Sequence, residues 1–278
     1  MGKIRRGWQL AKMSLSVVRK DKEILLFPLL SGIITLVILG SFFFGMIGFY
    51  GLTGITDDAN SAVFYVFFAV FYFVSFFVAV FFNACVVGSA TIRMNGGNPT
   101  FSDGIRAATG SLKQILLWAL FAATVGLILR AIQQRVGILG KVIVGLLGMG
   151  FAVASYFVVP VLVYEKLGPW SALKRSVSIL KGTWGEAIVG NFGLGAVFVL
   201  FGLLGLIPIV AGILIGSFWP IIAGVVVAVV YWLILGLIAS AATSVLLAAL
   251  YRYAMTGKTS EEFGDMSFTN PWAAPIYR

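Results

Sequence analysis

Residues able to carry out chemistry are scarce in this 278-residue sequence. It contains no histidine and a single cysteine, Cys85. This excludes zinc sites built from cysteine and histidine, histidine-based catalysis and any intramolecular disulfide. Glu165 and Glu186 flank a basic segment, but they stand too isolated to form an acid–base pair. The sequence therefore predicts a protein that is not an enzyme, with no catalytic residue, no metal site and no cofactor.

A few polar residues do lie inside long apolar stretches. They are Asn83, Asn191, Ser240, Thr243 and Ser244. Hydrogen bonding between helices is the simpler interpretation of such groups, and a substrate site is the alternative. No Asp, Glu, Lys or Arg falls at the centre of these stretches, so the carboxylate relay of a proton-coupled transporter is missing.

Basic residues gather in three short segments, each placed before a pair of apolar stretches. The segments cover residues 8–19, 101–112 and 170–181, and each begins with an aromatic residue. The third places apolar residues on one helical face and cations on the rest, a pattern typical of a helix lying in the lipid headgroup layer. Helices that simply connect the spans are the plainer alternative. The predicted lipid-headgroup or partner surface is Lys12, Arg19, Arg106, Lys174, Arg175 and Lys181, with Trp8, Trp170 and Trp184 as interfacial anchors.

Composition decides the class of protein. Hydrophobic residues make up 60% of the chain and charged residues 11%, whereas soluble domains have about 45–50% and about 25%. The net charge of +10 is spread beside apolar runs rather than forming a basic domain, which favours anionic lipid headgroups over nucleic acid as partners. The predicted fold class is an all-α, polytopic transmembrane helical bundle.

Six apolar stretches are long enough to cross a bilayer. The predicted spans are about 24–50, 63–92, 112–129, 142–163, 187–207 and 221–251, inside one transmembrane domain of residues 1–255. A cytoplasmic tail, residues 256–278, follows them. The uncharged stretch 187–251 is divided at Pro208–Pro220, and three spans there are the alternative. Paired in order, the six spans form three hairpins, each preceded by one basic segment.

Lysine and arginine predict the orientation of these spans. All but three of the 20 fall in tails and loops on one side, which the positive-inside rule places in the cytoplasm together with both termini. Arg130, Arg135 and Lys141 fall on the other side, against the rule. The basic N-terminal region is too long for a cleaved signal peptide and is expected to act as a start-inside anchor in a cell membrane.

Small residues recur every four positions in the last span. Gly236, Ser240, Ser244 and Ala248 form a stripe that lets another helix approach closely. That helix could belong to the same chain, to a second copy or to a protein partner.

Residues 160–176, which read PVLVYEKLGPWSALKRS, resemble a signature of prokaryotic six-helix membrane proteins. That broad group is largely uncharacterised and includes the membrane domain fused ahead of some bacterial glycerophosphodiester phosphodiesterases. The resemblance implies the fold and a prokaryotic plasma-membrane location. No phosphodiesterase domain accompanies these residues, so the activity does not carry over.

Two functions compete on this basis. The chemically quiet spans and the basic segments favour a membrane scaffold or accessory subunit that contacts lipid headgroups and partner proteins. The internal repeat and the Pro/Gly-interrupted segment 208–220 suggest the alternative, a transporter or channel for a lipidic or neutral solute. A polar cavity lined by Asn83, Asn191 and Ser244 would favour transport, and a solid apolar bundle would favour the scaffold.

Overall fold

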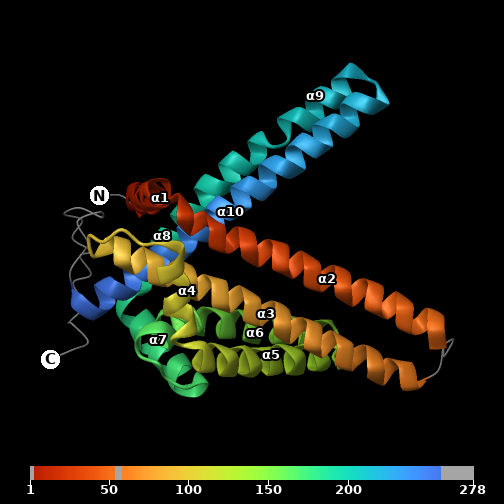
Figure 1. Ribbon diagram of the computed structural model, residues 1–278, viewed down its shortest axis with the longest axis horizontal. Coiled ribbons are helices and arrows are strands. Elements are labelled where there is room, and N and C mark those ends of the chain that lie inside the picture. Colours follow the sequence, from red (N-terminus) through yellow and green to blue (C-terminus); the bar gives the residue numbers. More distant parts are fainter. Residues whose placement is uncertain (1–2, 54–57, 258–278) are drawn as a thin grey trace. The chain divides into compact units, whose positions relative to one another are not determined.

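Helices account for every element of the described chain (Figure 1). The computed structural model describes residues 3–53 and 58–257, with side chains for residues 12–49, 63, 65–182 and 193–257. The helices are α1 Lys3–Lys20, η1 Lys22–Leu25, α2 Leu26–Thr53, α3 Asp58–Met94, α4 Phe101–Thr109, α5 Leu112–Arg135, α6 Ile138–Ala154, α7 Val158–Tyr164, α8 Pro169–Leu204, α9 Ile207–Ile215 and α10 Phe218–Thr256. The predicted all-α class is confirmed. Helices suit a bilayer because they satisfy their own backbone hydrogen bonds.

Among the described residues, six helical segments are long and apolar enough to cross a membrane. They are Lys22–Phe49, Tyr65–Met94, Leu112–Arg135, Ile138–Tyr164, Gly193–Ile215 and Phe218–Thr256. Their number agrees with the six predicted spans, and residues 187–251 contain two rather than three, but the fifth continues to Ile215 instead of ending at 207. Of the predicted tail, residues 258–278 lie outside the described residues.

The chain divides into two compact units. One comprises Met1–Pro28, Ser89–Phe101 and Lys181–Arg278, and the other comprises Leu29–Gly88 and Ser102–Leu180. We refer to them as the terminal unit and the central unit. Helices α2, α3 and α8 each run from one unit into the other.

In the central unit, aromatic contacts join neighbouring spans. The rings of Phe42 on α2 and Phe71 on α3 lie 4.8 Å apart, and Trp118 on α5 stacks on Phe151 of α6 at 6.0 Å. Each helix thereby buries one stripe of side chains against its neighbour. Such aromatic pairs contribute about 0.5–1.5 kcal/mol beyond the area they bury.

The fourth span is two helices where the sequence predicts one. The break between α6 and α7 frees the backbone N–H of Phe157, which donates to the hydroxyl of Ser176 on α8 at 2.9 Å. Phe157, Val161 and Leu162 are fully buried, so α7 forms a small core at one end of this unit. A buried N–H would be costly without a partner, and the serine supplies it.

In the terminal unit, α9 and α10 form a tight hairpin that turns at Gly216 in the left-handed conformation (φ 72°). A short break before α9 leaves backbone carbonyls without their usual helical donors. Tyr231 and Trp232 of α10 donate to the carbonyls of Phe201 and Gly202 at 2.8 and 2.9 Å. The third basic segment continues without interruption into the fifth span as α8, whereas the first two are separate helices.

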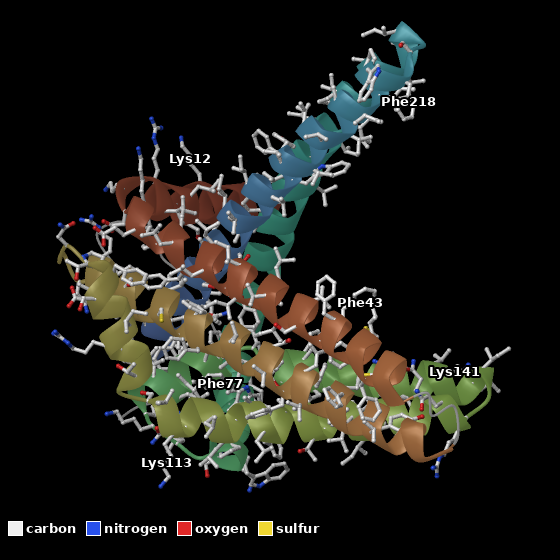
Figure 2. The ribbon with its side chains drawn as sticks, turned by 45° about the vertical axis from the view of Figure 1, so that its right-hand side comes forward. Lys12, Phe43, Phe77, Lys113, Lys141 and Phe218 are labelled. Atoms are coloured by element: carbon white, nitrogen blue, oxygen red, sulfur yellow. The ribbon has the colours of Figure 1, made fainter. Side chains whose placement is uncertain are left out.

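The outer faces of the long helices carry large exposed apolar side chains. Phe44 on α2 is 73% exposed and Leu214 on α9 is 81% exposed. Figure 2 shows Phe43 and Phe218 directed away from their ribbons. Patches of this extent are not tolerated in water, and they match the lipid tails of a bilayer.

Candidate lipid-headgroup surfaces

The short helices α4 and α7 gather at one end of the central unit. A Cβ added at Gly88 of α3 would collide with the side chain of Ala107, so α4 lies directly against α3. The hydroxyl of Ser111 donates to the carbonyl of Val163 at 3.2 Å and links the start of α5 to α7. We call this region the surface-helix end.

Basic side chains at the surface-helix end point outward. Arg106 of α4 is 80% exposed, and Lys113 and Lys174 are also exposed. On the opposite face of α8, Ala172 and Ile179 are fully buried. The first turns of α8 are therefore amphipathic, as the spacing predicts.

Trp170 lies where an interfacial anchor belongs. Its ring is 59% exposed and contacts Phe121 edge-on, with centroids 6.4 Å apart. The ammonium group of Lys174 lies 5.4 Å from the Trp170 ring centroid. An exposed aromatic ring beside a cation suits the headgroup layer, where one end of the pair meets apolar tails and the other meets water. The side chains of Trp8 and Trp184 lie outside the described residues.

Arg175 differs from the other predicted surface cations. Its guanidinium donates to both carboxylate oxygens of Glu165, at 2.9 and 3.0 Å, and its side chain is only 15% exposed. The pair joins the turn after α7 to α8. Its charge is therefore paired within the fold, and its predicted headgroup role stays a prediction.

In the terminal unit, α1 shows the amphipathic character expected of the first basic segment. Lys12 and Arg19 are exposed, while Ser14 and Val17 are fully buried. Within this unit α1 contacts η1 and α10. Lys181, at the start of the unit's part of α8, is exposed as predicted.

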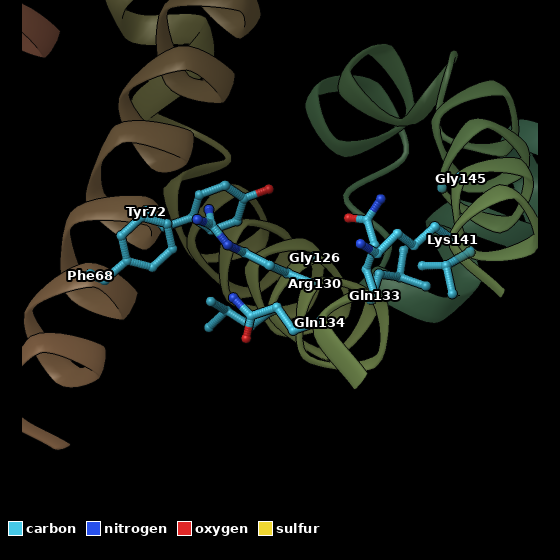
Figure 3. A pocket seen from close by; sticks show the side chains of 12 residues that line it. Phe68, Tyr72, Gly126, Arg130, Gln133, Gln134, Lys141 and Gly145 are labelled. Atoms are coloured by element: carbon cyan, nitrogen blue, oxygen red, sulfur yellow. The ribbon is translucent and has the colours of Figure 1, made fainter. Parts of the chain in front are cut away.

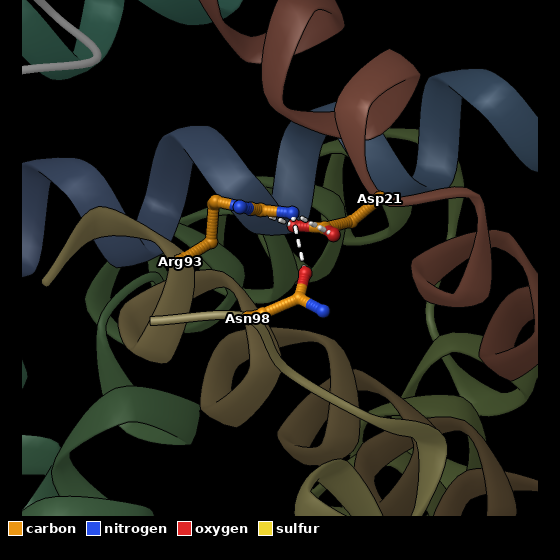
Figure 4. Close-up of polar contacts among 3 residues, drawn as sticks. All are labelled: Asp21, Arg93 and Asn98. Atoms are coloured by element: carbon orange, nitrogen blue, oxygen red, sulfur yellow. Dashed lines mark hydrogen bonds and ion pairs between the residues drawn. The ribbon is translucent and has the colours of Figure 1, made fainter. Parts of the chain in front are cut away.

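An ion pair fixes the end of α1 to the end of α3 (Figure 4). Arg93 donates to both carboxylate oxygens of Asp21, which is only 6% exposed, and to the side-chain oxygen of Asn98 at 2.9 Å. The guanidinium of Arg252 on α10 donates to the carbonyl of Met94 nearby. These contacts were not predicted, because the partners are far apart in sequence.

A cavity of about 660 Å³ opens at the other end of the central unit, between α3, α5 and the start of α6 (Figure 3). Figure 3 shows Arg130 reaching from α5 toward Phe68 and Tyr72 on α3, with Gln133 and Lys141 on the facing wall. The sequence singled out Arg130 and Lys141 only as exceptions to the positive-inside rule. Their position on the side where the rule disfavours cations could have indicated a binding site for an anion.

The polar residues inside the spans line neither cavity described in this protein. Ser244 donates to the carbonyl of Ser240 within α10 at 3.0 Å, and the buried side-chain oxygen of Asn83 has no hydrogen-bond partner among the described residues. The side chain of Asn191 lies outside the described residues. In the predicted small-residue stripe, Ser244 and Ala248 are buried, while Gly236 and Ser240 are exposed, so its role in close packing stays a prediction.

Six apolar helices with short basic helices at their ends define a multi-pass α-helical membrane protein. The chain belongs to a family of unknown function, DUF6159, whose profile matches residues 61–261. No curated protein matches the chain. The resemblance to an uncharacterised membrane-protein family is thus confirmed, and nothing in the match links it to glycerophosphodiester phosphodiesterases.

Proposed function

We propose that the protein is a non-enzymatic scaffold or accessory subunit of the cell membrane, which gathers anionic lipid headgroups and partner proteins at the cytoplasmic ends of its spans. One observation carries this proposal: α1, α4 and the first turns of α8 expose cations while burying their opposite faces. Arg106 and Lys174 show it in the central unit, and Lys12 and Arg19 show it in α1.

The chemistry of these cations supports headgroup binding. Lys113, Lys174 and Lys181 form no ion pair within the described residues, so their charges are available to phosphates. A basic residue near an anionic leaflet contributes about 1 kcal/mol of attraction. The positive-inside rule supports a cytoplasmic location for these helices and for both termini.

Transport of a lipidic or neutral solute is the competing proposal. It calls for a polar cavity at the middle of the spans, where alternating access would place a substrate. The two described cavities extend from the turn between α5 and α6 along these helices to Gly126 and Gly148, and neither is lined by Asn83 or Ser244. The scaffold is therefore the better supported of the two functions.

A fluorophore at the surface-helix end tests the proposal on the full-length protein. Cys85 is fully buried, so a Ser178→Cys substitution provides a selective label one turn from Lys174 and Lys181. In nanodiscs, nitroxide carried on the headgroup of phosphatidylglycerol should quench this label more strongly than nitroxide on phosphatidylcholine. Adding Lys174→Gln and Lys181→Gln should reduce the preference several-fold, since two cations of about 1 kcal/mol each are lost.

Arg135→Gln is the matched control, because it removes one exposed cation from the end of α5, at the other end of the central unit, without touching the cavity described above. It should leave the preference unchanged. Equal quenching by both lipids in the parent protein would contradict the lipid part of the proposal. For the partner part, cross-linked proteins that co-purify from native membranes should be lost from the Lys174→Gln/Lys181→Gln variant, and undiminished recovery would contradict it.

A further inference from the structure

The turn between α5 and α6 carries positive charge on the side where it is disfavoured. Arg130, Arg135 and Lys141 are the three cations that the predicted topology leaves outside the cytoplasm. Cations on this side run against the positive-inside rule, by which the other lysines and arginines predict the orientation of the spans. Ionisable groups kept at such positions in membrane proteins usually serve a function.

The fold brings two of these three cations to one cavity. Arg130 lies near the end of α5 and Lys141 in the first turn of α6, and the 660 Å³ cavity includes both, with Gln133 and Gln134, in its lining. Arg135 is exposed and does not line it. The charged residues of the lining are thus both cations, and no Asp or Glu is among them.

A contact with an aromatic ring orients Arg130, and no carboxylate of the described residues pairs with its charge. The Arg130 guanidinium lies 4.4 Å from the ring centroid of Phe68, a cation–π contact. The described residues provide no ion pair for Arg130 or Lys141. Both charges can therefore be satisfied by an anion that enters the cavity.

The shape of the cavity depends on glycines. A Cβ at Gly126 would lie 2.7 Å from the hydroxyl oxygen of Tyr72, so glycine lets that hydroxyl approach α5. At Gly145 an added Cβ would meet nothing within 4 Å, so this side of the cavity is open. The lining offers N–H donors from arginine, lysine and glutamine and an O–H donor from tyrosine. Phosphate oxygens accept such donors, and Arg binds them most specifically.

A second, more apolar cavity adjoins the first. Its volume is about 420 Å³, and it shares Phe68, Leu127, Arg130 and Gln134 with the first cavity. Its other lining residues are Tyr65, Val66, Ala69 and Ala131. Arg130 therefore stands at a boundary between polar and apolar space, which fits an amphiphile better than a free anion.

We propose that these joined cavities bind one anionic phospholipid of the outer leaflet, with its phosphate held by Arg130 and Lys141. Gln133, Gln134 and Tyr72 complete the donors, and the apolar cavity holds the first part of an acyl chain. This site goes beyond the proposed scaffold function, because it lies at the opposite end of the α5–α6 hairpin and binds a single molecule.

Native mass spectrometry of the purified full-length protein, titrated with defined lipids, tests the site. Phosphatidylglycerol should bind as one tight copy, and phosphatidylcholine should not. Arg130→Gln and Lys141→Gln should each weaken that copy about tenfold, which is the effect expected from losing a hydrogen bond to a charged group. Arg135→Gln removes the same charge from the same turn without touching the cavity and should leave binding unchanged.

A second variant separates the cavity from its charge. Gly145→Phe keeps both cations but fills the open side, so it should also abolish the tight copy. Loss of binding in Arg135→Gln equal to that in Arg130→Gln would overturn the proposal, as would retention in Gly145→Phe. Displacement of the lipid by millimolar inorganic phosphate would assign the site to a free anion instead. Failure of this test leaves the label at Ser178 unaffected, so the two proposals fail separately.

Discussion

At the scale of single residues, the pair of Asp21 and Arg93 determines where the first basic helix is held. Asp21 follows α1 directly, and Arg93 lies in the last turn of α3. Glu23 adds to the junction by accepting the backbone N–H of Phe101 at 2.5 Å, and Phe27 stacks on the Phe101 ring at 5.0 Å. These contacts therefore hold the end of α1 in place and, with it, the direction in which its basic face points.

We expect Arg93→Gln to destabilise the protein by roughly 3 kcal/mol, because it leaves the buried Asp21 carboxylate without its cation. Denaturation of the purified protein in detergent measures this. Arg106→Gln is the control, since Arg106 is 80% exposed and lies 3.9 Å from Asp103. A pair of that kind contributes at most about 1 kcal/mol. Equal losses in the two variants would show that the junction is not structural.

Individual charges show how far residue roles can be predicted from sequence. The spacing of Lys174 and Lys181 on one amphipathic stretch was sufficient to predict their exposure, because helical periodicity is local. The roles of Arg175 and Arg93 depended on partners ten and 72 residues away. Such pairings arise from tertiary packing, so a single sequence does not determine them. For Arg130, a ligand could be proposed only once the fold had shown the cavity that this residue lines.

At the scale of elements, the α9–α10 hairpin is held by two glycines that each face a proline on the other helix. A Cβ at Gly212 would lie 2.5 Å from the carbonyl oxygen of Pro220, and one at Gly224 would collide with the carbonyl of Pro208. The helices approach at these positions rather than at the exposed Gly236 of the predicted stripe.

Gly212→Ala should lower the stability of this hairpin by about 1–3 kcal/mol, because the added methyl group meets backbone that cannot move aside. Gly236→Ala is the matched control. An added Cβ there meets nothing within 4 Å, so it should be neutral or stabilise by up to about 1 kcal/mol through helix propensity. Thermal unfolding in detergent distinguishes the two. A larger loss for Gly236→Ala would instead favour a close helix partner at the stripe.

The elements themselves were largely predictable, and their ends were not. Long uncharged runs identify spans because a bilayer tolerates little else. The break in the fourth span depends on Ser176 of α8 accepting a hydrogen bond from Phe157, a contact that hydropathy does not encode. Helix α8 runs without interruption from Pro169 to Leu204 although Gly185 and Gly190 lie within it, because an isolated glycine weakens a helix without ending it.

At the scale of the whole molecule, the two proposals concern opposite ends of the central unit's spans. Arg106 and Lys174 are exposed at the surface-helix end, where we propose contact with many headgroups, and Arg130 and Lys141 line the cavity where we propose a single lipid. Helix α5 runs 24 residues between these ends, a length of about 36 Å, which is sufficient to cross a hydrocarbon core of about 30 Å. The two proposals therefore predict lipid contacts in opposite leaflets.

Labelling of intact cells with a membrane-impermeant maleimide tests this arrangement most directly. Cys85 is fully buried, so cysteines introduced at Leu139, which is 83% exposed, and at Ser178 can be compared in separate variants. We expect Leu139→Cys to react from outside and Ser178→Cys to react only after the membrane is permeabilised. Reaction of both from the same side, or the reverse pattern, would contradict it.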